Sequence, residues 1–192
     1  MSEAAVRGLR RGAILAGVLA VAMGGGWLML REERGEASDP AAGYAAAVGG
    51  PFTLTDTKGR RFGTGQLRGK PFAIFFGFTR CPDVCPTTLS RLARLRAKLG
   101  ADGDRINVVF VSVDPESDTP EEIGRYLTLF DTPIIGLTGT PGELAAVQRA
   151  YAVYAERVPL EGGGYTNDHT ATVFLMGGGG EFVSTVYGDG DS

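Results

Sequence analysis

The chain has 192 residues, of which 43% are hydrophobic and 21% are charged, and its formal net charge is −3. This length suits one folded domain with a small appendage, and the composition is that of an ordinary globular protein. Because basic residues are not in surplus, the composition argues against a nucleic-acid-binding protein.

An uncharged segment near the start, Gly12–Leu30, has the length of a transmembrane helix. At about 1.5 Å per residue it would span roughly 28 Å, which is close to the thickness of a bilayer's hydrocarbon core. Three basic residues precede it: Arg7, Arg10 and Arg11. By the positive-inside rule, residues 1–11 should therefore lie in the cytoplasm.

We expect an uncleaved, single-pass anchor at residues 12–30 in the cell inner membrane. A linker of small and polar residues would follow at 31–48, and a folded domain at 49–192 on the periplasmic, extracytoplasmic side. A cleaved signal peptide is the alternative, and it would export the domain as well. The apolar run is longer than the core of a signal peptide, and charged residues follow it at once.

The first part of the domain predicts a hairpin, a buried strand and a helix. Phe52–Leu54 and Arg61–Phe62 flank a turn signal at Asp56–Gly59. Phe72–Phe76 is a continuous apolar run, which is typical of a central strand. Residues 86–99 predict a helix. Its apolar face would consist of Leu89, Leu92, Leu95 and Leu99.

The second part continues the alternation. Four more strands are expected, at residues 106–113, 134–137, 171–176 and 181–187. A helix should follow each of the first two, because a Thr-Pro pair marks each helix start, with Thr119 and Thr140 as N-caps. The glycine run 177–180 should join the last two strands as a hairpin. We therefore predict an α/β fold with a mixed sheet.

The only two cysteines and the only histidine are the candidates for chemistry. Cys81 and Cys85 lie between a predicted strand and a predicted helix, as in a thioredoxin-like fold. Their C-x-x-x-C spacing is one residue wider than the usual redox motif. Both precede proline, which disfavours helical backbone. We therefore expect the pair on a stiff loop outside the helix, with Cys85 near the N-cap, where the helix dipole favours the thiolate.

These residues fit more than one chemistry. A structural disulfide would close a loop of about five residues and remove only roughly 2 kcal/mol of chain entropy, against about 3 for a 15-residue loop. Two thiolates and the imidazole of His169 would instead form a three-ligand metal site. Such a set suits copper, and zinc also fits it. A dithiol reaction of the cysteines is a further alternative. Asp168 is a candidate to orient the His169 ring.

Five short motifs follow one another along the domain: Phe76–Pro86, Val111–Pro115, Asp118–Pro120, Leu137–Gly139 and Asp168–His169. This series resembles the SCO/SenC family over about residues 49–188. The resemblance implies a thioredoxin-like fold with an N-terminal membrane anchor. It also implies a protein that delivers copper to the dinuclear copper centre of cytochrome c oxidase subunit II. Some members of the family act as thiol–disulfide reductants of that centre.

By position, the resemblance implies that Cys81, Cys85 and His169 bind one copper ion per domain, as Cu(I) or Cu(II). It also implies that the two cysteines can form a redox-active disulfide. Asp114 lies in a motif near the metal loop, where its carboxylate would either support the site or shape a turn. We expect a metallochaperone rather than an enzyme that turns over, with a thiol–disulfide oxidoreductase as the alternative.

Two features depart from the family pattern. Ser117 stands where the family often has Arg, which puts a salt bridge or partner contact at that place in doubt. Relatives usually continue into a final helix beyond the position of Ser192. The chain is therefore either a short member or an incomplete sequence, and we expect part of the sheet to be uncovered.

Overall fold

The structure, a computed structural model, describes residue 43 and residues 47–186. The expected cytoplasmic segment, the anchor and most of the linker lie outside these residues. None of the helices within them is long and apolar enough to cross a membrane.

The described chain alternates strands and helices in the predicted order up to α5. The strands are β1 (Thr53–Asp56), β2 (Arg61–Gly63), β3 (Phe72–Gly77), β4 (Asn107–Ser112), β5 (Ile135–Thr138), β6 (Ala155–Pro159), β7 (Tyr165–His169), β8 (Val173–Met176) and β9 (Phe182–Val186). The α-helices are α3 (Val84–Leu99), α4 (Pro120–Leu127) and α5 (Pro141–Ala150), and the 3₁₀ helices are η1 (Thr64–Leu67) and η2 (Gly100–Arg105).

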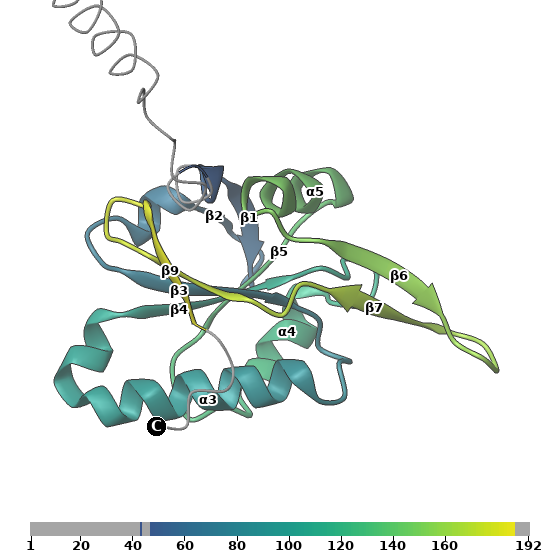
Figure 1. The fold of residues 1–192 in the computed structure, drawn as a ribbon. Coiled ribbons are helices and arrows are strands. Elements are labelled where there is room, and N and C mark those ends of the chain that lie inside the picture. The colour runs from purple at the N-terminus through teal and green to yellow at the C-terminus, as the bar shows by residue number, and fades with distance from the viewer. Residues whose placement is uncertain (1–42, 44–46, 187–192) are drawn as a thin grey trace, which may run out of the picture. The chain divides into compact units, whose positions relative to one another are not determined.

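Seven strands form one sheet in the order β2-β1-β5-β4-β3-β8-β9. The central strands β3, β4 and β5 are parallel, whereas β1 and β8 pair with them antiparallel. Figure 1 shows α3 and α4 on one face of this sheet and α5 on the other. The prediction of an α/β fold with a mixed sheet is therefore confirmed.

Helices on both faces explain why the central strands are apolar on both sides. Every residue of β3 is buried, as is every residue of β4 except the first. Phe76 of β3 packs against Tyr151 at the end of α5, with 5.4 Å between ring centroids. Its neighbour Phe75 packs against Phe110, which in turn contacts Tyr126 of α4. Successive residues of one strand thus fill the core on opposite faces.

Helix α3 differs from its prediction in two respects. It starts at Val84, two residues earlier than expected. Leu89 and Leu92 are buried as predicted, but Leu95 and Leu99 are 39% and 50% exposed. These two leucines line an open, mainly apolar cavity of about 260 Å³ beside β8 and β9. The second half of the apolar face is therefore not packed into the core formed by the described residues.

The Thr-Pro signals start α4 and α5 as predicted. The hydroxyl oxygens of Thr119 and Thr140 accept hydrogen bonds from the backbone N–H groups of Glu122 and Glu143. Of these two helices, only α5 has the full capping box, because the Glu143 carboxylate also accepts from the Thr140 N–H at 2.8 Å. In α4 the corresponding carboxylate, that of Glu122, pairs with Arg125 instead.

A second sheet, formed by β6 and β7, was not predicted. The two antiparallel strands pair Ala155 with His169 at one end and Pro159 with Tyr165 at the other. The signal was missed because β6 is mostly exposed and ends in proline, and β7 consists of polar, mostly half-buried residues without an apolar alternation. The hairpin projects from the domain beside α5 in Figure 1.

We predict that Glu143 stabilises the fold in a pH-dependent way. The hydrogen bond from Arg61, helped by the Thr140 N–H, lowers the pKa of Glu143 to about 2. A depressed carboxyl pKa contributes stability above the unfolded value of about 4.5, and this contribution is lost as the pH falls towards 2. Urea unfolding of wild type and Glu143→Gln should therefore differ at pH 7, and the difference should shrink below pH 4.5.

The exposed Glu161, in the turn between β6 and β7, provides the control. Glu161→Gln should leave the urea midpoint at pH 7 close to that of the wild type. A Glu143→Gln difference that stays constant down to pH 2.5 would contradict this prediction.

Candidate metal centre

The structure brings the two cysteines and the histidine together beyond the carboxyl end of β3. The sulfur atoms of Cys81 and Cys85 and a ring nitrogen of His169 all lie within 4.8 Å of one another. Cys85 Sγ is 3.5 Å from Nε2 of His169. In the described part of the chain, this is the only such group of potential ligands.

The two cysteines differ in backbone setting, and this corrects the sequence prediction. Cys81 lies on the loop, as expected, but Cys85 lies in the first turn of α3, after the N-cap Asp83. Pro86 does not prevent this, because the first N–H groups of a helix have no intrahelical acceptor and proline lacks only such a group. The N–H of Cys85 points back to Cys81 Sγ at 3.5 Å.

The sulfur of Cys85 fits its place only because residue 77 is glycine. A Cβ atom on Gly77 would lie 2.7 Å from Cys85 Sγ and about 3 Å from the rings of Phe75 and Phe110. Real Cβ contacts do not occur at 2.7 Å. The end of β3 therefore leaves room for one buried sulfur.

Burial controls the protonation of Cys85. The residue is 0% exposed. Desolvation raises the pKa of its thiol well above the usual range, and the neighbouring Cys81 raises it further. The expected stabilisation of the thiolate by the helix dipole is therefore outweighed in the metal-free protein. A bound cation would reverse this balance, because a coordinating thiol is deprotonated by the metal itself.

The ring of His169 is already oriented for coordination. Nδ1 lies 3.1 Å from the carbonyl oxygen of Thr170, which can only accept, so Nδ1 carries the proton. Nε2 therefore keeps its lone pair on the side of Cys85. Burial lowers the pKa of His169, which favours the neutral ring that binds metals. Phe75 and Phe78 pack edge-to-face against the ring, with 6.0 and 5.8 Å between ring centroids.

The two candidate supporting carboxylates lie in different surroundings. Asp168 is exposed, and its charge only partly offsets the lowering of the His169 pKa by burial. The ring donates its hydrogen bond to the backbone oxygen of Thr170 instead. The side chain of Asp114 is 0% exposed and accepts hydrogen bonds from Arg80 and Tyr165. Its backbone carbonyl also accepts from the N–H groups of the following turn. Asp114 thus both shapes the turn and contacts the residue before Cys81.

Several residues around the site were missed by sequence reasoning. They are Thr79, Arg80, Arg157, Tyr165 and Thr170. Ser117 also joins this network, through its hydroxyl contacts with Arg80 and Tyr165. Tyr165 stands four residues before His169, a spacing that places both on one face once residues 165–169 are known to form a strand. The others act through backbone atoms or long side chains, which no spacing reveals.

The donor set fits a soft metal ion. Two thiolate sulfurs favour Cu(I), and the imidazole suits copper in either oxidation state. Two sulfurs and one nitrogen also match a zinc site with an open position. Both cysteines are free thiols in this structure, so both sulfurs are available as ligands.

The mixed sheet and this Cys₂His site define a thioredoxin-like domain with a candidate centre for one soft metal. The family model described as SCO1/SenC matches residues 40–192. The chain therefore belongs to the SCO1/SenC family, which confirms the resemblance read from its motifs.

Solved and curated relatives agree with this assignment. The structure of Bradyrhizobium japonicum ScoI with copper bound is 49% identical, with a TM-score of 0.70 over 73% of this chain and 90% of that one. Yeast Sco1 with copper bound is 36% identical, with a TM-score of 0.67 over 73% and 79%. The mitochondrial SCO1 homolog 1 of Arabidopsis thaliana is 42% identical over 138 residues. The aligned part covers 71% of this chain and 41% of that relative's length.

We predict that Gly77→Ala damages the metal centre through the sulfur of Cys85. The added methyl must displace this sulfur or the rings beside it, which costs typically about 1–3 kcal/mol in a packed core. Thermal unfolding should show lower stability, and the affinity for Cu(I), measured against a competing chelator, should fall as well.

Gly142→Ala is the matched control, because a Cβ at this position in α5 has no neighbour within 4 Å. It should leave metal affinity unchanged and stabilise the helix by roughly 0.5–1 kcal/mol. Wild-type metal affinity in Gly77→Ala would show that the site tolerates movement of Cys85.

Proposed function

We propose that this protein is a membrane-anchored metallochaperone that binds one copper ion through Cys81, Cys85 and His169. The observation that carries the proposal is the pre-set ring of His169. Its Nδ1 proton is held by a backbone oxygen, so its Nε2 lone pair faces the buried sulfur at 3.5 Å. Two related structures contain bound copper, which supports copper rather than zinc as the metal.

We further propose that the copper is delivered to the dinuclear centre of cytochrome c oxidase subunit II, as family membership suggests. The exposure of the site favours transfer from one side. Cys81 is half-buried, while Pro82, Asp83 and Val84 beside it are exposed. A partner's thiolate or imidazole would approach from this rim, replace Cys81 first, and leave the buried Cys85 and His169 as the last ligands.

An anchor at residues 12–30 would suit such a role, because it would hold the domain on the periplasmic face of the inner membrane, beside a membrane-embedded oxidase. The segment lies outside the described residues. Its uncharged length and the arginines before it remain the basis for this part of the proposal.

A second candidate function is reduction of the partner's cysteines. It is favoured by two free thiols on neighbouring segments, one half-exposed and one buried. In that reaction Cys81 would attack a partner disulfide and Cys85 would resolve the mixed disulfide. The partner would gain two electrons and two protons, and this pair would end as a disulfide. This chemistry needs both cysteines but not His169.

Copper loading of the purified full-length chain should separate the two functions. We expect one Cu(I) per wild-type chain and none held tightly after Cys81→Ser or Cys85→Ser. Loss of a partner that only orients a ligand costs about 10–100-fold in metal affinity. Loss of the ligand itself in His169→Ala should cost at least as much. Thiol–disulfide exchange with a small disulfide should persist in His169→Ala.

Asp168→Asn is the matched control, since it changes the exposed neighbour of His169 without touching the ring nitrogens. It should retain one copper ion at nearly wild-type affinity. If His169→Ala also binds copper as tightly as the wild type, the imidazole is not a ligand, and reductase activity becomes the better assignment.

A further inference from the structure

The three ligands come from two segments that have to be aligned with each other. Cys81 and Cys85 follow β3 of the large sheet, whereas His169 ends β7 of the separate two-stranded sheet. At its base the hairpin is fixed by hydrogen bonds between Tyr154 and Thr170. Beyond this base, side-chain contacts must determine how β7 lies relative to the cysteine loop, residues 78–83 between β3 and α3.

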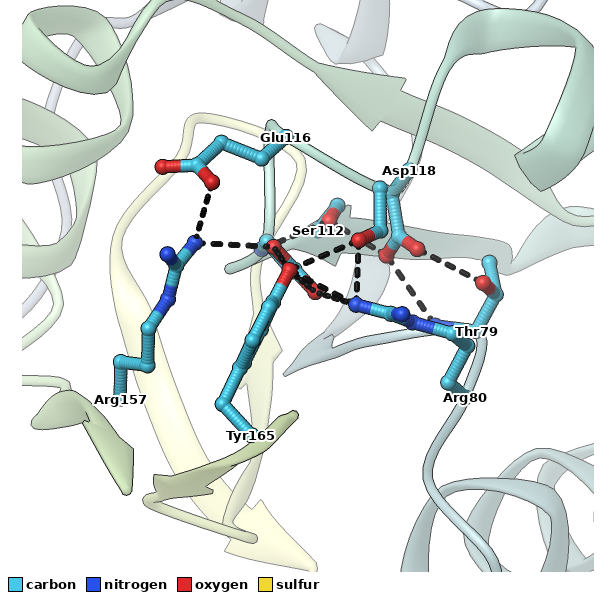
Figure 2. A network of polar contacts seen from close by, with 9 residues as sticks. Thr79, Arg80, Ser112, Glu116, Asp118, Arg157 and Tyr165 are labelled. Carbon is cyan, nitrogen blue, oxygen red and sulfur yellow. Dashed lines mark hydrogen bonds and ion pairs between the residues drawn. The ribbon is translucent and has the colours of Figure 1, made fainter. Parts of the chain in front are cut away.

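Tyr165 makes these contacts. Residues two and four apart on a strand share a face, so Tyr165 and His169 point to the same side of β7. The Tyr165 hydroxyl lies 3.0 Å from Asp114 Oδ1, 2.7 Å from Arg80 Nη2 and 2.8 Å from Ser117 Oγ. Its ring lies between two guanidinium groups, with Arg157 3.8 Å and Arg80 5.0 Å from the centroid. Figure 2 shows it between them.

The cysteine loop is held on its other side by two buried carboxylates. Asp118 accepts from the N–H of Thr79 at 3.0 Å and from its hydroxyl at 2.6 Å. Asp114 accepts from Arg80 at 3.0 Å. Two successive residues, directly before Cys81, are thus tied to the turn after β4. Because Arg80 bonds both Asp114 and Tyr165, the same guanidinium links the loop to β7.

The turn after β4 is itself rigid. Ser112 donates to Asp118 at 2.6 Å and accepts from the N–H of Asp114 at 3.0 Å. The carbonyl of Asp114 accepts from the N–H groups of Ser117 and Asp118. Charge is balanced as well, because Arg157 lies 3.8 Å from Asp114 and 2.9 Å from Glu116. A turn held in this way can fix the separation between the loop before Cys81 and β7.

We propose that Arg80, Asp114 and Tyr165 form a clamp that sets the distance between Cys81 and His169, and that they act as positioning residues for the metal. The inference rests on the proposed copper site. The clamp touches no ligand atom. It holds Cys81 through the preceding residue, and it holds His169 through the strand face that Tyr165 shares with it. Opening the clamp would leave the three ligands present but poorly aligned.

Tyr165→Phe tests the clamp, because it removes one hydroxyl and keeps the ring between the two arginines. We expect Cu(I) affinity of the purified full-length chain to fall about tenfold, within the range known for partners that orient ligands. The thiolate-to-Cu(II) absorption band should shift in energy or intensity, since it reports the Cys–Cu geometry. Arg80→Lys keeps the positive charge but loses the planar guanidinium, which can bond Asp114 and Tyr165 at once. It should lower the Cu(I) affinity and shift the absorption band in the same direction as Tyr165→Phe.

Tyr154→Phe is the matched control. Tyr154 flanks the same hairpin, and its hydroxyl bonds to Glu156. Its loss should leave affinity and spectrum at wild-type values. If Tyr165→Phe lowers the thermal stability but keeps wild-type copper affinity and spectrum, its role is structural only and the clamp is overturned.

A measurement on the metal-free protein tests the clamp independently of copper binding. In the metal-free protein, the ¹⁵N and ¹H signals of the single histidine ring should shift in Tyr165→Phe and stay in place in Tyr154→Phe. If the wild type binds no copper while these signals shift as expected, the proposed function fails and the clamp stands. Unshifted signals in Tyr165→Phe would overturn the clamp whatever the wild type binds.

Discussion

The sulfur of Cys85 lies against the backbone of Gly77, where the last residue of β3 has no side chain to exclude it. A Cβ there would come within 2.7 Å of this sulfur. The contact places a thiol at the end of the central strand and inside the core, where it is 0% exposed. Desolvation then keeps the thiol protonated until a cation arrives. The burial of this sulfur, and with it the depth of the site, depends on this one approach.

The rest of the site is arranged around that fixed sulfur. The ring of His169 comes from a different sheet, and it arrives with its tautomer already set by the Thr170 carbonyl. The polar network in Figure 2 links the residues before Cys81 to β7 through Arg80 and Tyr165. Its buried carboxylates, Asp114 and Asp118, hold the loop before Cys81, and each is neutralised or hydrogen-bonded on several sides. Buried polar groups that are fully partnered favour one arrangement, because leaving any of them unpaired is costly.

Most of the large sheet could be predicted from sequence, for reasons that particular segments show. Phe72–Phe76 reads as a strand because a continuous apolar run fits a position buried on both faces. The starts of α4 and α5 follow from Thr119 and Thr140, whose hydroxyls cap orphan N–H groups locally. The β6–β7 hairpin escaped prediction, since β6 is mostly exposed and the half-buried residues of β7 are polar. The expected burial of Leu95 and Leu99 failed because helical periodicity shows which residues share a face and does not show what covers that face.

The sequence by itself determined the chemistry available to this protein. It contains two cysteines and one histidine, and the motifs around them give the family. Only the tertiary structure decided how these groups work together. In the structure, Cys85 lies inside the first turn of α3, and burial raises the pKa of its thiol although the helix dipole was expected to favour the thiolate. The hydrogen bond that orients the His169 ring goes to a backbone oxygen. The physical reason is that identity and spacing are local properties, whereas burial and hydrogen-bond partners depend on segments far apart in the chain.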